Sequence, residues 1–320
     1  MLYVAPMMAW TDRHCRYLHR LFSPSAVLFT EMVSTGALTH GKQWHQLAFN
    51  PEEHPVVLQL GGNDPEALAY CANEAFQRGF DEVNLNVGCP SDRVQNGAFG
   101  ACLMKQPERV AACVAAMTNL ARGPISVKCR LGVDGADSDE LLDAFVETVS
   151  EAGCHRFYVH ARIAILAGLS PAQNRDIPPL QPERVRALKE RFPHLEIIVN
   201  GGVTDLDTFE DYRTWSDGVM IGRAAFHDPS LLNLCHQRII GDSDVVDRQA
   251  LMQSYAEYAA KQFTKGVRLQ ALIKPLLGTC NGMPGARSFR RTLSDHRRLQ
   301  AGDLSIFQDA FEQVYRGAAA

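Results

Sequence analysis

Short apolar segments alternate with amphipathic segments about eight times between residues 2 and 221 of this 320-residue chain. Each apolar segment is bounded by turn residues and followed by a stretch of helical period, so the pattern predicts strand and helix in turn. The eight predicted strands cover residues 2–5, 27–30, 56–60, 82–86, 125–129, 157–160, 196–200 and 218–221. This number and spacing are typical of a (β/α)8 TIM barrel, an α/β fold.

The predicted helices cover residues 12–21, 65–78, 107–120, 139–152, 182–191 and 205–212. Proline opens several of them, at a position where its missing N–H costs nothing. The alternative fold is a doubly wound open sheet. No G-x-G-x-x-G motif opens the first strand–helix unit, and an open sheet of so many parallel strands is less common than a closed one. We therefore predict a closed barrel.

The strand pattern stops after residues 228–229, and the sequence GDSD at residues 241–244 has the composition of a linker. The longest helical stretch follows at residues 246–263. We therefore predict two domains, a TIM barrel at residues 1–240 and a small all-helical domain at residues 241–320.

Basic residues gather in the predicted helical domain. Between residues 261 and 298, nine Lys or Arg accompany a single acid, Asp295, which gives a local net charge of +8 and leaves −12 for the rest of a chain whose total is −4. Such asymmetry indicates binding to a polyanion, although charge runs are also typical of a solvated helix face. Arg287, Arg290 and Arg291 have spacings that place them on one helix face.

The composition is that of a soluble globular protein, with 46% hydrophobic and 21% charged residues. No apolar run approaches the roughly 18 residues that a membrane span needs, and the N-terminus lacks the pattern of a signal peptide. Nine cysteines without a C-x-x-C pair suit a reducing compartment. We expect a cytoplasmic protein without membrane association and, in the absence of a metal-ligand spacing, without a bound metal.

One thiol stands out among the nine. Residues 84–91 read NLNVGCPS, a buried strand that runs into a turn set by Gly88 and Pro90. Cys89 therefore lies just past the carboxyl end of the fourth predicted strand, where a barrel has its active site, and is a candidate acid or nucleophile. A free cysteine is most often a small buried hydrophobe, and we interpret its main competitor, Cys102, in this way.

Other polar residues follow the remaining strands. Lys128 and His160 are expected inside the barrel mouth, where a buried cation needs an anionic partner such as the N1–C2=O region of a reduced flavin. Gln59 can donate and accept at once, which suits the pyrimidine edge of an isoalloxazine. An ion pair, a core histidine and a hydrogen bond within the barrel are the respective structural alternatives. Glycine turns after the seventh and eighth strands, with Arg223, suit a phosphate.

The chain resembles the tRNA-dihydrouridine synthases over nearly its whole length. The resemblance is carried by the motifs at residues 5–7, 84–91, 97–101, 127–128, 159–162, 200–202 and 218–223. Residues 10–17, 174–175, 177–180 and 287–291 resemble the branch of that family that acts at positions 20 and 20a of tRNA. Three residues depart from the pattern: Ala9 replaces an acid, Ala172 a lysine and Phe289 a tryptophan. These departures concern the RNA contacts.

The resemblance implies an FMN-dependent barrel that reduces uridine to 5,6-dihydrouridine in the tRNA D-loop with NADPH. Hydride would pass from flavin N5 to uracil C6, and Cys89 would give the proton to C5. A thiol, with an ordinary pKa of about 8.5, is mostly protonated at neutral pH and can serve as that acid. The target base would be turned out of the RNA into the pocket. We expect a monomer.

The resemblance also assigns the remaining site residues. Those implied for FMN are Ala5, Pro6, Met7, Gln59, Lys128, His160, Asn200, Gly201, Gly202, Gly222 and Arg223. Those implied for tRNA are Asn86, Ala172, Arg175, Arg287 and Arg290.

Three other functions stay open. An FMN barrel that acts on a free pyrimidine, as dihydropyrimidine and dihydroorotate dehydrogenases do, leaves the basic C-terminal region unexplained. A Schiff-base lyase that uses Lys128 would show no flavin colour. A tRNA-binding protein without catalysis would need neither Cys89 nor the glycine turns.

Overall fold

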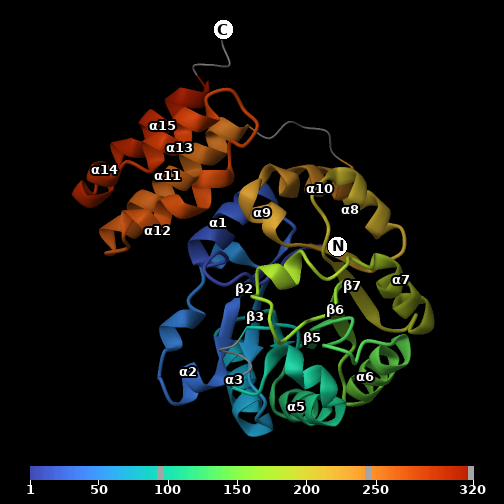
Figure 1. Ribbon diagram of the computed structural model, residues 1–320. Helices are drawn as coiled ribbons and strands as arrows, with labels where there is room; N and C mark the ends of the chain where they lie inside the picture. The colour runs from blue at the N-terminus through green and yellow to red at the C-terminus, as the bar shows by residue number, and fades with distance from the viewer. Residues whose placement is uncertain (92–96, 242–246, 316–320) are drawn as a thin grey trace.

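The computed structural model describes residues 1–91, 97–241 and 247–315. Eight parallel strands form a closed barrel in chain order, with β1 hydrogen-bonded to β8 (Figure 1). The strands are β1 (Leu2–Val4), β2 (Val27–Ser34), β3 (Val56–Gly61), β4 (Glu82–Asn86), β5 (Ile125–Arg130), β6 (Arg156–His160), β7 (Glu196–Asn200) and β8 (Gly218–Ile221). The predicted barrel is confirmed, and the open sheet is wrong.

One strand is clearly longer than its prediction. β2 continues to Ser34 because the register between β2 and β3 shifts between Phe29 and Met32, which lets the strand continue past Thr30. Such bulges absorb extra residues near barrel rims. The charge of Glu31 interrupts the apolar run, so periodicity alone stops the strand too early.

Helices surround the barrel, and the six predicted ones are confirmed. They are α1 (Arg13–Phe22), α3 (Pro65–Gln77), α5 (Pro107–Leu120), α6 (Asp139–Glu151), α7 (Pro182–Arg191) and α8 (Leu206–Arg213). Several other elements were not predicted: α2 (Thr35–Thr39), α9 (Arg223–His227), α10 (Ser230–Ile240) and the 3-10 helices η1 (Trp44–Leu47), η2 (Pro51–Glu53), η3 (Gly100–Lys105) and η4 (Gln173–Arg175).

The barrel separates two apolar layers. Strand residues such as Leu58, Leu85 and Val127 are fully buried in the layer between strands and helices. Because side chains alternate along a strand, the residues between them point into the barrel. A small apolar cluster there includes Tyr158 and Met220. Polar residues of β3 to β6 fill the rest of the interior as far as the carboxyl ends of the strands.

The C-terminal part contains only helical elements among its described residues. They are α11 (Arg248–Thr264), α12 (Leu269–Ile273), η5 (Lys274–Gly278), α13 (Ala286–Leu293), α14 (His296–Ala301) and α15 (Ser305–Tyr315). This helical part lies beside α1 and α9 of the barrel (Figure 1). The division at residue 241 stays a prediction because residues 242–246, on which the predicted linker falls, lie outside the described residues.

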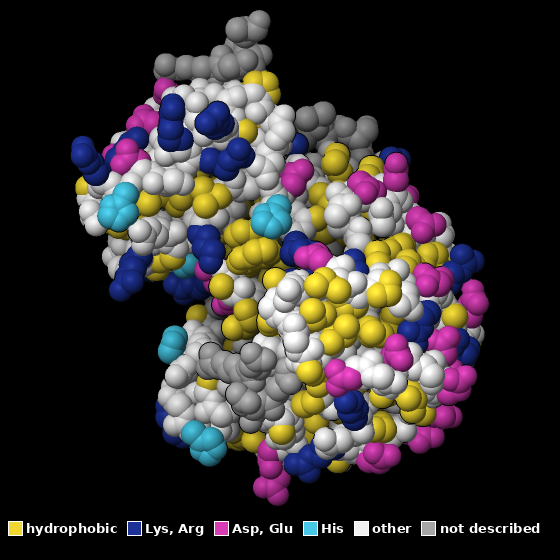
Figure 2. Space-filling view, in the orientation of Figure 1, with side chains coloured by type: hydrophobic (Ala, Val, Ile, Leu, Met, Phe, Trp, Pro, Cys, Tyr) yellow, Lys and Arg dark blue, Asp and Glu magenta, His cyan; other side chains and the backbone are white. Residues whose placement is uncertain are grey.

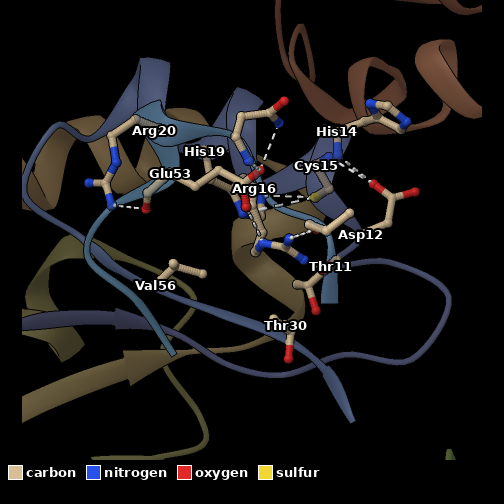
Figure 3. Close-up of polar contacts among 12 residues, drawn as sticks. Thr11, Asp12, His14, Cys15, Arg16, His19, Arg20, Thr30, Glu53 and Val56 are labelled. Atoms are coloured by element: carbon tan, nitrogen blue, oxygen red, sulfur yellow. Dashed lines mark hydrogen bonds and ion pairs between the residues drawn. The ribbon is translucent and has the colours of Figure 1, made fainter. Parts of the chain in front are cut away.

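A buried polar network joins the barrel to the helical part. Arg16 of α1 pairs with Glu53 of η2 at 2.5 Å between Nε and Oε2 (Figure 3). Asn50 donates from Nδ2 to Glu53 Oε1 (2.7 Å) and to the hydroxyl of Tyr258 on α11 (3.1 Å). The same hydroxyl lies 2.7 Å from His14 Nδ1. These contacts tie α11 to the start of the barrel.

No helix in the described ranges has the length and apolar character that crossing a membrane requires.

Candidate active site

The strand register gathers the polar residues at the carboxyl ends of the strands. Asn86 pairs with Lys128 across β4 and β5, and His160 pairs with Asn200 across β6 and β7. Gln59 of β3 lies one hydrogen bond from Asn86, at 2.8 Å. The structure therefore brings these five predicted residues into one mouth of the barrel.

Cys89 sits on a turn that is held from two sides. Asn86 Oδ1 accepts the N–H groups of Gly88 (3.2 Å) and Cys89 (3.0 Å). Arg130 Nε donates to the Gly88 carbonyl at 2.9 Å. The thiol is half-buried and lies 3.5 Å from the hydroxyl of Ser91. Because the turn is fixed in this way, the thiol is presented at the mouth with little backbone freedom.

The competing thiol has a different setting. Cys102 lies in η3 and donates to the Phe99 carbonyl at 3.1 Å, and burial raises the pKa of Cys102. Lys105 interacts electrostatically with it and opposes the effect of burial. By contrast, Lys128, Arg130 and Arg175 all interact electrostatically with Cys89. The assignment of Cys89 as the reactive thiol stays a prediction.

Lys128 is a cation without a partner among the described residues. Burial, with a smaller contribution from Arg130, lowers the pKa of Lys128 to about 8. In residues 1–91, 97–241 and 247–315, no side chain or carbonyl forms an ion pair or hydrogen bond with its ammonium group. Burial, together with Arg130 and Lys128, also lowers the pKa of His160 well below its usual value, so its imidazole is neutral. A half-buried cation without a counter-charge favours an anionic ligand.

Arg130 was expected at the mouth, because its position two residues after Lys128 places it on the same inward face, but no binding or catalytic role was predicted for it. Burial lowers its pKa to about 10, and it is 3% exposed. Besides Gly88, its guanidinium donates to the carbonyls of Ile163 (2.9 Å) and Asn174 (3.0 Å). It therefore ties the Cys89 turn to the loop after β6.

The glycine turn after β7 has a backbone that other residues rarely adopt. Gly201 and Gly202 have φ of 113° and 77°. A Cβ on Gly201 would lie 2.9 Å from Cδ2 of His160, and one on Gly202 would lie 2.4 Å from Cδ2 of Leu180. Asn200 Nδ2 donates to the Met220 carbonyl at 2.9 Å, which joins this turn to β8. Glycine is thus required here, and it allows close approach of a ligand.

The predicted residues after β8 and β1 lie at the rim. A Cβ on Gly222 would meet no atom within 4 Å. The guanidinium of the exposed Arg223 forms two hydrogen bonds with Asp176, the shorter at 2.6 Å, so this arginine already has an anionic partner. At β1, Ala5 is buried and donates to Ile221, whereas Pro6 and Met7 are half-buried.

The residues predicted for tRNA divide into two groups. Asn86 is in the mouth, and Ala172 and Arg175 are exposed at η4 on its rim. Arg287 and Arg290 are exposed on α13 of the helical part, away from the mouth residues. Figure 2 shows Lys and Arg gathered over this helical part and acids along the opposite side of the barrel.

Phe289 belongs to the interior of the helical part. It is fully buried and stacks on Phe311 with ring centroids 6.4 Å apart. Its departure from the family pattern therefore affects packing before it affects RNA. Among the described residues no three His, Cys, Asp or Glu side chains gather as metal ligands would; the absence of a bound metal stays a prediction.

Comparison with solved structures shows the same fold. The chain matches a 2-naphthoyl-CoA reductase bound to 2-naphthoyl-CoA with a TM-score of 0.57 and 12% identity, over 75% of this chain and 50% of that one. It matches a morphinone reductase variant in complex with tetrahydroNAD with a TM-score of 0.50 and 12% identity, over 78% and 89%.

Comparison with known sequences identifies closer relatives. The tRNA-dihydrouridine(20/20a) synthase of Vibrio parahaemolyticus is 50% identical over 315 residues, which cover 98% of this chain and 96% of the relative. The protein of the same name from Escherichia coli is 49% identical over 313 residues, or 97% and 90%. The family model described as dihydrouridine synthase (Dus) matches residues 3–315. The chain therefore belongs to the dihydrouridine synthase family.

Proposed function

We propose that this protein reduces uridine to 5,6-dihydrouridine at positions 20 and 20a in the D-loop of tRNA, with FMN as cofactor and NADPH as reductant. The observation that carries the proposal is that relatives named for this activity are 49–50% identical to this chain over nearly its full length. The barrel mouth supports it with a half-buried thiol, an unpaired lysine and a glycine turn.

The mouth fits FMN. Lys128 lacks an anionic partner among the described residues, and Gly201 and Gly202 leave room where side chains would clash. We propose that the residues that would hold the flavin ring are Lys128, His160, Gln59, Ala5, Pro6 and Met7. The phosphate end would be held by Asn200, Gly201, Gly202, Gly222 and Arg223. The Arg223 guanidinium would release the Asp176 carboxylate and bind the phosphate in its place. Bound FMN, once reduced by NADPH, supplies the hydride that C6 of uracil receives.

Cys89 supplies the proton. Hydride addition at C6 places negative charge on C5 and O4 of the ring, and the S–H bond of Cys89 breaks as its proton moves to C5. The sulfur keeps the bonding electron pair as a thiolate, which the charges of Lys128 and Arg130 stabilise. Water returns the proton afterwards. Asn86 and Arg130 contribute by fixing the turn on which the thiol sits.

The tRNA is held outside the mouth. A base of folded RNA is reached only after it leaves its stack, so Asn86 and Arg175 would receive the turned-out uridine, with Ala172 at the rim beside them. Arg287 and Arg290 of α13 would contact phosphates of the tRNA that lie away from the mouth. We propose a monomer in the cytoplasm, where this substrate is made.

A second candidate rests on one observation. A lysine whose pKa lies near 8 has the property that Schiff-base enzymes exploit. A lyase of this class would be trapped on its substrate by borohydride and would purify without flavin absorbance.

The test combines colour, product and two matched variants. We expect the purified protein to show flavin absorbance and to form dihydrouridine in a tRNA transcript with NADPH. Cys89→Ala should lower the rate by about 10²- to 10⁴-fold, the usual contribution of a general acid, while Cys102→Ala stays near the wild-type rate. Absence of flavin would refute the FMN mechanism, and the reverse order of the two variants would show that Cys102 is the acid.

A further inference from the structure

Buried polar side chains line one wall of the barrel from its mouth to its amino end. Asn86, Gln59, Asn84, Ser126 and Glu82 come from the adjacent strands β3, β4 and β5, and none is more than 8% exposed. The four residue steps from Glu82 to Asn86 correspond to roughly 13 Å of strand. Buried polar groups need partners, and each of these side chains is hydrogen-bonded to the next one along the wall.

At the mouth end of the wall, the side-chain amide of Asn86 can take only one of its two orientations. Asn86 Oδ1 faces two backbone N–H groups, those of Gly88 and Cys89. Its amide nitrogen must then point the other way, and Nδ2 donates to Gln59 Oε1 at 2.8 Å. Amide orientation is often ambiguous, but here the backbone donors fix it.

The same direction continues downward. Gln59 Nε2 donates to Asn84 Oδ1 at 2.8 Å, and Asn84 Nδ2 donates to Ser126 Oγ at 2.8 Å. The Ser126 hydroxyl donates to Glu82 Oε1. Every link therefore donates away from the mouth.

The lower end is an acceptor. The Glu82 carboxylate receives Ser126, the Tyr158 hydroxyl (3.1 Å) and the guanidinium of Arg156. Burial raises the pKa of Glu82, and these three donors oppose that effect. Arg156 also pairs with Glu196 at 2.7 Å. Since an ionised carboxylate cannot donate, both ends impose one direction on the chain.

We propose that Glu82 is a positioning residue: through this one-way chain it holds Gln59, and through Gln59 it holds Asn86, so that the free group of Asn86 at the mouth is an N–H donor, which selects uracil over cytosine. The proposal rests on the proposed function. Asn86 Oδ1 is fully used by two N–H groups, so the remaining group of this side chain is one N–H. Uracil carries a carbonyl acceptor at C4, whereas cytosine carries an amino donor there. The N–H donor at the mouth can therefore bind the C4 carbonyl of uracil. With cytosine, the same N–H would face the C4 amino group, which is also a donor, and no hydrogen bond could form.

Two variants each remove one of the hydroxyl groups that donate to the Glu82 carboxylate. Ser126→Ala breaks the chain, whereas Tyr158→Phe takes a donor from Glu82 and leaves the chain intact. We expect Ser126→Ala to weaken FMN binding about tenfold and to lower about tenfold the ratio of kcat/KM for transcripts with uridine or cytidine at position 20. Tyr158→Phe should stay within about twofold of wild type in both, and the Kd for tRNA should change in neither.

Glu82→Gln and Glu196→Gln provide a second pair around Arg156. Both variants replace by a neutral amide a carboxylate that pairs with the Arg156 guanidinium. Only Glu82 is also the last acceptor of the hydrogen-bond chain. If each pair gives equal effects on selectivity, the chain has no positioning role and the proposal is overturned.

A measurement without ligand separates this proposal from the proposed function. In ¹⁵N-labelled full-length protein, Ser126→Ala should shift the side-chain amide signals of Gln59 and Asn86, and Tyr158→Phe should leave them in place. Unchanged signals in Ser126→Ala overturn the chain even if the enzyme is active. Wild-type protein that forms no dihydrouridine refutes the proposed function, whereas the amide signals still decide the chain.

Discussion

The charge of Lys128 makes flavin binding depend on pH. Its pKa of about 8, against an ordinary 10.5, means that the side chain is charged at pH 7 and largely neutral at pH 9. Above pH 8, Lys128 must take up a proton before its ammonium group can donate to the flavin ring. The affinity of the apoprotein for FMN should therefore be level from pH 7 to just below 8 and fall by up to tenfold per pH unit above it. Titration by flavin fluorescence at pH 7, 8 and 9 measures this.

Two lysine variants show whether this dependence belongs to Lys128. Lys128→Met should bind FMN more weakly and with little change between pH 7 and 9, because the titrating group is gone. Lys105→Met removes an exposed lysine that pairs with Asp134 at 2.8 Å and should keep the wild-type profile. A wild-type profile as flat as that of Lys128→Met would place Lys128 away from the bound anion.

Between elements, one carboxylate holds α1 to η2. Glu53 is completely buried, pairs with Arg16 at 2.5 Å and accepts the N–H and Nδ2 of Asn50, each at 2.7 Å. Glu53→Ala leaves a guanidinium buried without its counter-charge, which costs about 3–5 kcal/mol. Its neighbour Glu52 is exposed, so Glu52→Ala should change the free energy of unfolding by less than about 0.5 kcal/mol. Urea denaturation followed by circular dichroism measures both, and equal midpoints would contradict the prediction.

The same elements show what the sequence could predict. Strands and long helices are local patterns, and period and caps such as Asp12, Asp64 and Ser138 mark them within a few residues. The bulge in β2 and the 3-10 helices depend on packing, which no local period records. The inward positions of candidate residues such as Gln59 and Lys128 could be predicted by counting along each strand, whereas their roles stay predictions. Their partners were not, because contacts such as that between Arg130 and Asn174 join residues 44 apart in sequence.

At the scale of the whole molecule, charge divides the protein into a basic helical part and a more acidic barrel. Residues 261–298 carry a net charge of +8, and the rest of the chain −12. On α13 the buried face consists of Ala286, Phe289 and Leu293, which leaves Arg287 and Arg290 exposed. The Arg290 guanidinium donates to Asn281 at 2.6 Å. This division steers a polyanion toward the helical part and away from the acidic side of the barrel.

Reversal of two charges on α13 tests this division. Arg287→Glu with Arg290→Glu should weaken tRNA binding and, because each lost phosphate contact removes about 0.7–0.9 from the slope of log Kd against log salt, reduce that slope by about 1 to 2. The control is Arg186→Glu on α7, which reverses a single exposed arginine paired with Glu190 on the barrel; it should leave the slope unchanged. Filter binding at several salt concentrations gives both quantities. If the control lowers the slope as much as the α13 variant does, the RNA responds to net charge alone, and a specific contact with α13 is refuted. If neither lowers it, the phosphates are held elsewhere, and the exposed arginines of α13 only keep the helix solvated.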